Sequence, residues 1–144
     1  MPDITTQQQH TVARPATVSG VGLHSGERVT VTFQPAAPDT GIVFVRTDLP
    51  GQPAVRAHVS SVVDTSKAPR RTSISSGAAE VHTIEHAMAA LWGVGIDNVR
   101  VDISGVELPF GSAKLMSCSL AALYARLAKA VTSARTSSER GSAP

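Results

Sequence analysis

The chain has 144 residues, of which 42% are hydrophobic and 17% charged, and its formal net charge is +2. This length builds one ordinary domain with one core, and the composition is that of a globular protein, since no apolar run is long enough to cross a bilayer. The single cysteine, Cys118, excludes a disulfide framework and a cysteine-rich zinc site. Aromatic residues make up 3% of the chain, too few for a base-stacking surface, so we expect no nucleic-acid partner.

The N-terminal part of the chain is typical of β-structure after a polar start. Residues 1–10 contain neither a basic nor an apolar stretch, so no secretory signal is visible, and we expect a ragged N-terminus and a cytoplasmic protein. Pro15 separates two short β-like segments, which suits an edge strand or a bulge. Residues 27–34 alternate apolar and polar side chains and predict a half-buried strand.

Three glycines, Gly20, Gly22 and Gly26, precede this strand. Their spacing differs from the G-x-G-x-x-G pattern of dinucleotide sites, and no helix follows them, so we predict a tight connection between two strands. His24 lies at the tip of this connection. The spacing alone is equally compatible with an exposed loop histidine and with a site residue.

Turn and strand signals alternate through the next part of the chain. Residues 35–41 combine Pro, Asp and Gly as a turn does, and residues 42–47 are predicted to return as the second strand of a hairpin. Residues 48–58 read as a loop. Two further short strands are expected at 59–65 and 72–75, the second pairing back on the first.

Residues 82–93 predict an amphipathic helix with an unusual second face. One face carries the apolar residues, at helical spacing: Ile84, Ala87, Met88, Leu91 and Trp92. The other carries three titratable side chains and then only small residues: His82, Glu85, His86, Ala89, Ala90 and Gly93. Small residues let another element approach closely, so we expect this helix to be covered on both sides.

The end of the chain predicts one more strand and one more helix. Residues 98–103 alternate as a strand, residues 113–131 have leucines near helical spacing, and the low-complexity stretch 132–144 is expected to be disordered. Strands followed by two helices around one strand favour an α+β domain over 11–131, a mostly antiparallel sheet with two helices packed on one face.

His82, Glu85 and His86 are the strongest candidates for a metal site. Two imidazoles four residues apart on a helix can reach one ion, and H-x-x-E-H is the pattern of one class of zinc hydrolases. Catalytic zinc, however, needs three protein ligands, and no third ligand lies at a fixed spacing. The spacing leaves a metal site and a purely structural cluster open.

Several longer motifs resemble one family, the UDP-3-O-acyl-N-acetylglucosamine deacetylases of lipid A biosynthesis. The resemblance runs in order from about Thr11 to Pro109. It is carried by residues 20–26, 38–42 and 46–49, by Asp64-Thr65, and by 83–86 through 89–91 to 95–99. It implies one of the two similar α+β domains of a cytoplasmic zinc amidohydrolase, whose site lies between the domains.

The resemblance assigns roles residue by residue. Glu85 matches the general base and His86 a zinc ligand, whereas His82 matches no ligand. Thr65 matches a residue near the substrate, and His24 falls in a motif with a supporting role. The remaining zinc ligands and the acid that protonates the leaving amine belong to the family's second domain, so we expect the 144 residues to be inactive alone.

The chain departs from the family pattern after Glu107-Leu108-Pro109. Phe110 alone precedes Gly111-Ser112, where the family has Ile-Met-Asp, which suggests a truncated or frameshifted gene. Two other hypotheses stay open: an H-x-x-E-H metallopeptidase that uses His82 and His86, and a non-catalytic module that binds a UDP-sugar or pairs with another chain. Whether the chain is part of a deacetylase or a non-catalytic module, we expect a second domain or chain to cover the small-residue face of the helix at 82–93.

Overall fold

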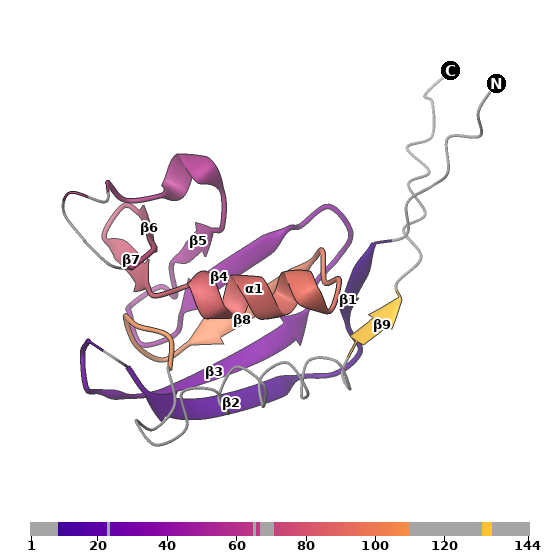
Figure 1. Cartoon of the computed structure of the whole chain (residues 1–144), viewed down its shortest axis with the longest axis horizontal. Coiled ribbons are helices and arrows are strands. Elements are labelled where there is room, and N and C mark those ends of the chain that lie inside the picture. Colours follow the sequence, from indigo (N-terminus) through magenta and orange to yellow (C-terminus); the bar gives the residue numbers. More distant parts are fainter. Residues whose placement is uncertain (1–8, 23, 65, 67–70, 110–130, 134–144) are drawn as a thin grey trace.

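The computed structural model describes residues 9–22, 24–64, 66, 71–109 and the backbone of 131–133. Its centre is a five-stranded sheet in the order β2-β3-β8-β4-β5 (Figure 1). The strands are β2 (Ala16–Val21), β3 (Arg28–Pro35), β8 (Val99–Ile103), β4 (Ile42–Arg46) and β5 (Ala54–Arg56). All neighbours are antiparallel except β4 and β8, so the predicted mostly antiparallel α+β architecture is confirmed.

The predicted hairpin between β3 and β4 is wrong. β8 lies between these two strands, antiparallel to β3 and parallel to β4, and it pairs with five residues on each side. Val99, Val101 and Ile103 of β8 are fully buried. Removing these apolar side chains from water stabilises the fold, which favours a central position for this strand. The turn residues at 35–41 could not show that a strand distant in sequence would lie between β3 and β4.

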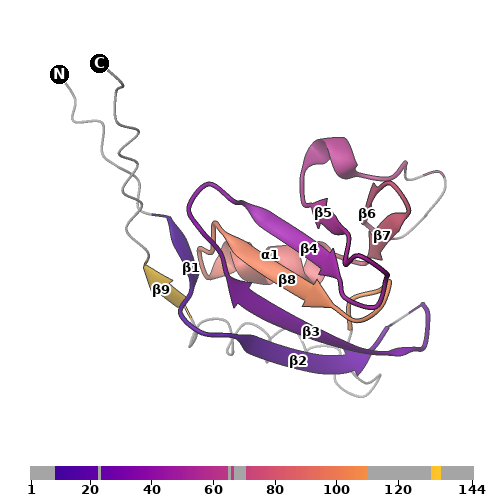
Figure 2. The ribbon, with the colours of Figure 1, turned by 180° about the vertical axis from the view of Figure 1, so that it is seen from behind.

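One helix, α1 (Glu85–Gly93), lies along one face of the sheet, and no described helix covers the opposite face (Figures 1 and 2). Its buried side chains are Ala87, Ala90 and Leu91. They pack with the inward residues of the sheet, among them Phe33 and Phe44, in one core. The second predicted helix, at 113–131, falls outside the described residues except for Val131, which belongs to a strand.

The end of α1 follows its glycine. Gly95 has a φ of +76°, its N–H donates to the Trp92 carbonyl, and the N–H of Ile96 donates to the Leu91 carbonyl. These two bonds form a Schellman motif, in which a left-handed glycine satisfies the last carbonyls of a helix. The helix predicted over residues 82–93 thus ends at the predicted residue, Gly93.

A small subregion adjoins the N-terminal end of α1. It consists of the short 3₁₀-helix η1 (Val59–Ser61) and the hairpin of β6 (Ser73–Ser76) and β7 (Ala79–His82) (Figure 1). The predicted strand 59–65 is reduced to η1 and one bridge between Val62 and Ile74. Arg46 anchors the hairpin, since its guanidinium donates to the Glu80 carbonyl at 2.7 Å and to the Asp48 carboxylate.

At the other end of α1, β1 (His10–Val12) pairs with β9 (Val131–Ser133). Thr132 and Ser133, expected in a disordered tail, thus lie in a strand, while residues 134–144 fall outside the described residues. His10, expected in the ragged start, is also in a strand, and its N–H donates to Asp97 at 2.8 Å. Of the helices described, none is long and apolar enough to span a membrane.

Candidate functional site

The junction between β7 and α1 separates the two histidines of the H-x-x-E-H pattern. His82 is the last residue of β7, and the helix begins only at Glu85. Between them Thr83 has a φ of +60°, a left-handed conformation that is strained for a β-branched residue. The His82 ring contacts the Glu80 carboxylate at 2.9 Å. Our expectation that His82 shares a helix face with His86 is therefore wrong, which counts against the metallopeptidase hypothesis.

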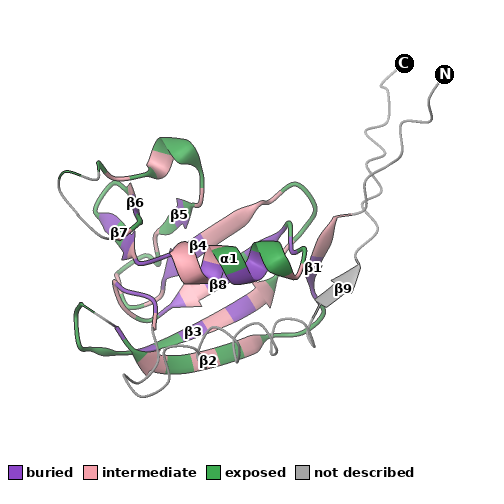
Figure 3. Cartoon of the chain, in the orientation of Figure 1, coloured by how far each residue is buried: buried purple, intermediate pink, exposed green. Residues whose placement is uncertain are grey.

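The apolar face of α1 also differs from the prediction at its end. Trp92 is 87% exposed, whereas Ala90, expected on the opposite face, is buried. Figure 3 shows that α1 carries both buried and exposed segments. Each residue advances about 100° around a helix, so Trp92 lies about 80° from Ile84 in one direction of rotation. Ala87 and Leu91 lie on the other side of Ile84. Burial is centred near Ala87 and Leu91, because that side faces the sheet.

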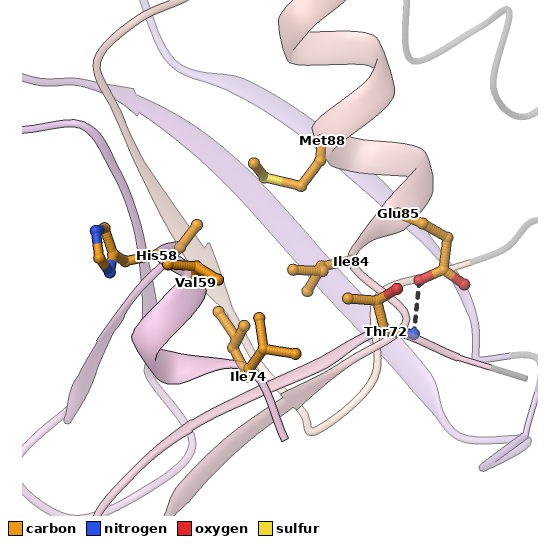
Figure 4. A pocket seen from close by; sticks show the side chains of 9 residues that line it. His58, Val59, Thr72, Ile74, Ile84, Glu85 and Met88 are labelled. Carbon is orange, nitrogen blue, oxygen red and sulfur yellow. Dashed lines mark hydrogen bonds between the residues drawn. The ribbon is translucent and has the colours of Figure 1, made fainter. Parts of the chain in front are cut away.

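Glu85, the predicted base, is the first residue of α1 and borders a pocket of about 430 Å³. Its carboxylate accepts a hydrogen bond from the Thr72 N–H at 3.2 Å, drawn in Figure 4. The lining is mostly apolar: Ala57, His58, Val59, Val62, Thr72, Ile74, Ile84, Glu85 and Met88. The structure thus places a carboxylate at the edge of an apolar hollow between α1 and the subregion.

His86, the predicted metal ligand, follows Glu85 in the first turn of α1 and is half-buried. Within the described part of the chain, no three His, Cys, Asp or Glu side chains are grouped so that they could hold a metal ion. Zinc in proteins takes at least three such ligands. The described residues therefore do not by themselves fit a complete zinc site, and His86 could supply only one of the ligands.

His24, the other described candidate, lies in the turn between β2 and β3 and is exposed. Its N–H donates to the Glu107 carboxylate at 2.7 Å, and the Ser25 N–H donates to the same oxygen at 3.1 Å. The second Glu107 oxygen accepts from the Thr83 hydroxyl at 2.9 Å. One carboxylate therefore connects the His24 turn to the residue that precedes α1 by two positions.

Glu107 is only 2% exposed, and burial on its own would raise the pKa of its carboxyl group. The hydrogen bonds from Ser25, His24 and Thr83, together with the charge of His24, outweigh burial and hold this pKa below its ordinary value. Glu107 is therefore ionised at neutral pH, although it is buried.

Sequence reasoning missed Thr72, Thr83 and Glu107 as parts of this region. Thr83 stands inside a motif that carries the family resemblance and Glu107 near the end of the matching stretch, but no spacing relates residues 24 positions apart in the sequence. Thr65, the predicted substrate contact, lies outside the described residues. Of the four predicted site residues, Glu85 and His86 are adjacent, and His24 is linked to them through Glu107.

Fold and site together define an α+β domain with a candidate functional site at the start of its described α-helix. The family model described as UDP-3-O-acyl N-acetylglycosamine deacetylase matches residues 9–136, and the chain belongs to this family. The match extends past Pro109, where the sequence motifs placed its end.

Three relatives carry the name UDP-3-O-acyl-N-acetylglucosamine deacetylase. The protein of Geobacter sp. (strain M21) is 48% identical over 122 residues, 85% of this chain and 37% of its own length. That of Myxococcus xanthus is 52% identical over 101 residues, covering 70% and 31% of the two chains. That of Bdellovibrio bacteriovorus is 43% identical over 103 residues, covering 72% and 33%. The chain thus spans about a third of the length of these relatives.

Proposed function

We propose that this chain supplies the N-terminal half of an active site for the zinc-dependent deacetylation of UDP-3-O-acyl-N-acetylglucosamine, a cytoplasmic step of lipid A biosynthesis. The observation that carries the proposal is the position of Glu85 and His86. They are the first two residues of the only described α-helix in a domain of this family, and Glu85 borders a pocket. The names of the relatives support the substrate.

In this proposal Glu85 acts as general base in amide hydrolysis. A water molecule attacks the carbonyl carbon of the acetamide while Glu85 accepts its proton. The C–N bond then breaks, acetate leaves, and the amine of the sugar takes up a proton. His86 would be one ligand of the zinc ion, which supplies Lewis-acid polarisation when bound. His24 and Thr65 are proposed to lie near the substrate.

We further propose that a second domain or chain completes the site and covers the outer face of α1. Ala89 and Trp92 on that face are exposed, Trp92 to 87%. An exposed tryptophan among small side chains leaves apolar surface that another element can bury closely. The 144 residues alone are then expected to be inactive, because the described part of the chain offers His86 as one ligand and no group of three, which catalytic zinc needs.

The test is a chimera in which residues 9–109 of this chain replace the matched segment of the Geobacter relative. Acetate release from UDP-3-O-acyl-N-acetylglucosamine is measured for this chimera and for the 144-residue chain. We expect activity from the chimera only, and a loss of about 10²–10⁴-fold in kcat for Glu85→Gln, the usual contribution of a general base.

The matched control is Glu80→Gln, because Glu80 is an exposed carboxylate of the same subregion that contacts His82. This variant should retain the activity of the chimera. An inactive chimera, an unaffected Glu85→Gln variant, or the 144-residue chain working at the rate of the chimera would each contradict the proposal.

The exposed Trp92 also favours a second candidate function, a non-catalytic module that pairs with another chain or binds a UDP-sugar. Light scattering and thermal melting with added UDP-N-acetylglucosamine distinguish the two. A concentration-dependent dimer that Trp92→Ala abolishes, or a raised melting temperature, together with an inactive chimera would favour the module. A monomer whose melting is unaffected by the nucleotide sugar would exclude it.

A further inference from the structure

Glu107 lies where three segments distant in sequence meet. The segment 106–109 follows β8 and runs beside the end of β7: the His82 N–H donates to the Val106 carbonyl and the Leu108 N–H to the His82 carbonyl. Pro109 forms a bridge with Gly22 on the opposite side. The Glu107 side chain thus stands between the β2–β3 turn and the start of α1.

The β2–β3 turn approaches the Glu107 carboxylate so closely that the carboxylate fits only because residue 22 is a glycine. A Cβ atom added to Gly22 would lie 2.4 Å from the Glu107 Oε1 atom, inside any real contact distance. The backbone N–H groups of His24 and Ser25 converge on that same oxygen. Gly22 therefore admits the carboxylate, and the next residues bind it.

On the other side, the second Glu107 oxygen binds the hydroxyl of Thr83, whose φ of +60° is unfavourable for a β-branched side chain. Such a conformation is unfavourable and persists only where its surroundings fix it. The bond to a buried, ionised carboxylate is a charge-assisted one, the stronger kind of hydrogen bond, and it fixes Thr83 in this state.

We propose that Glu107 is a positioning residue: by binding Thr83 and the His24 turn at once, it sets where α1 begins and hence where the side chains of Glu85 and His86 lie. The functional consequence rests on the function proposed above. The structural coupling does not, because it follows from the three hydrogen bonds and the backbone conformation of Thr83.

The coupling is tested by amide hydrogen exchange in the 144-residue chain. The Ile84 and Met88 N–H groups flank Glu85 and His86 and donate to Thr72 and Ile84 carbonyls, whereas the Ile96 N–H closes the far end of α1. In Glu107→Gln, which keeps the shape and removes the charge, we expect exchange at Ile84 and Met88 to accelerate about tenfold and exchange at Ile96 less than about twofold.

Thr83→Val and Thr83→Ser provide a second pair that leaves Glu107 in place. Valine keeps the shape without the hydroxyl and should reproduce the effect of Glu107→Gln, while serine keeps the hydroxyl and should restore the wild-type rates. Thr47→Val is the matched control, because it removes a hydroxyl that donates to the Ile103 carbonyl elsewhere in the fold. It should leave Ile84 and Met88 unchanged.

The inference is overturned if Glu107→Gln folds and leaves Ile84 and Met88 at wild-type rates, or if it accelerates Ile96 equally, which would indicate general destabilisation. If Glu107→Gln does not fold, the Thr83 pair decides: equal rates in the valine and serine variants overturn the inference. Failure of the proposed function is separate, since an inactive chimera with the exchange pattern intact would remove the deacetylase role and retain the coupling.

Discussion

Glu107 combines burial with ionisation, and its three hydrogen bonds explain how both are possible. Burying a charged carboxylate without hydrogen-bond partners would cost much free energy, and the group would take up a proton instead. Here the His24 and Ser25 N–H groups and the Thr83 hydroxyl stabilise the charged form, and the pKa of Glu107 falls below its ordinary value. The charge is useful because it draws the donors of two separate segments to one point.

This pKa predicts how stability depends on pH. Because the pKa of Glu107 is lower in the folded than in the unfolded chain, its charged form stabilises the fold at every pH above the unfolded value near 4.5. That contribution is lost as pH falls through the lower pKa of the folded chain. We expect the free energy of unfolding in urea to decrease from pH 6 to pH 3.

The comparison variant is Glu107→Gln, which cannot ionise and should show a smaller decrease over the same pH range. Asp48, whose pKa is lowered by its hydrogen bond to Arg46, contributes equally to both proteins and cancels in the difference. Identical pH profiles for the two proteins would contradict the assignment of a lowered pKa to Glu107.

At the scale of elements, α1 has a firmly defined end and an unusual beginning. Its C-terminus is closed by the two hydrogen bonds around Gly95, while its N-cap, Ile84, offers no side-chain hydrogen bond. The first turn is instead held by the Thr72 backbone through Glu85 and by Thr83 through Glu107. The end of the helix that carries the candidate site therefore depends on tertiary contacts.

The two faces of α1 predict opposite results for adjacent residues. Leu91→Ala removes a fully buried side chain and should lower the free energy of unfolding by about 2–5 kcal/mol. Trp92→Ala removes a larger side chain that is 87% exposed and should change it by less than about 0.5 kcal/mol. Urea denaturation measures both, and a loss at Trp92 similar to that at Leu91 would show that the chain buries this face.

At the scale of the whole molecule, β8 unites the fold. β8 follows β3 and β4 in the sequence but lies between them in the sheet, so it joins the β2–β3 pair to the β4–β5 pair. The sheet carries α1 on one face, with the subregion of η1, β6 and β7 at the start of the helix and the β1–β9 pair at its end (Figures 1 and 2).

This arrangement predicts the order of amide exchange across the sheet. The hydrogen-bonded amides of β8 are flanked on both sides and should open only with global unfolding, whereas those of β2 and β5 at the edges open locally. We expect β8 amides to exchange roughly 100-fold more slowly than edge-strand amides. Equal rates would indicate that β8 does not hold the centre of the sheet.

The sequence by itself determined the family, the α+β class and the elements that depend on local signals. β2, β3, β8 and the Gly95 stop of α1 follow from alternation, turn residues and a glycine that can adopt positive φ, and each is encoded within a few neighbouring residues. Glu85 and His86 were predicted as site residues from the short motif 83–86, which resembles the family, and the structure places them at the start of α1.

Only the tertiary structure decided which distant segments meet. That His82 ends a strand, that β8 separates β3 from β4, and that Glu107 joins Thr83 to the His24 turn all depend on contacts between residues far apart in the chain. The physical reason is that helix spacing and strand alternation are patterns of neighbouring residues. The hydrogen bonding of a polar side chain such as Glu107 depends instead on the donors that folding brings to it.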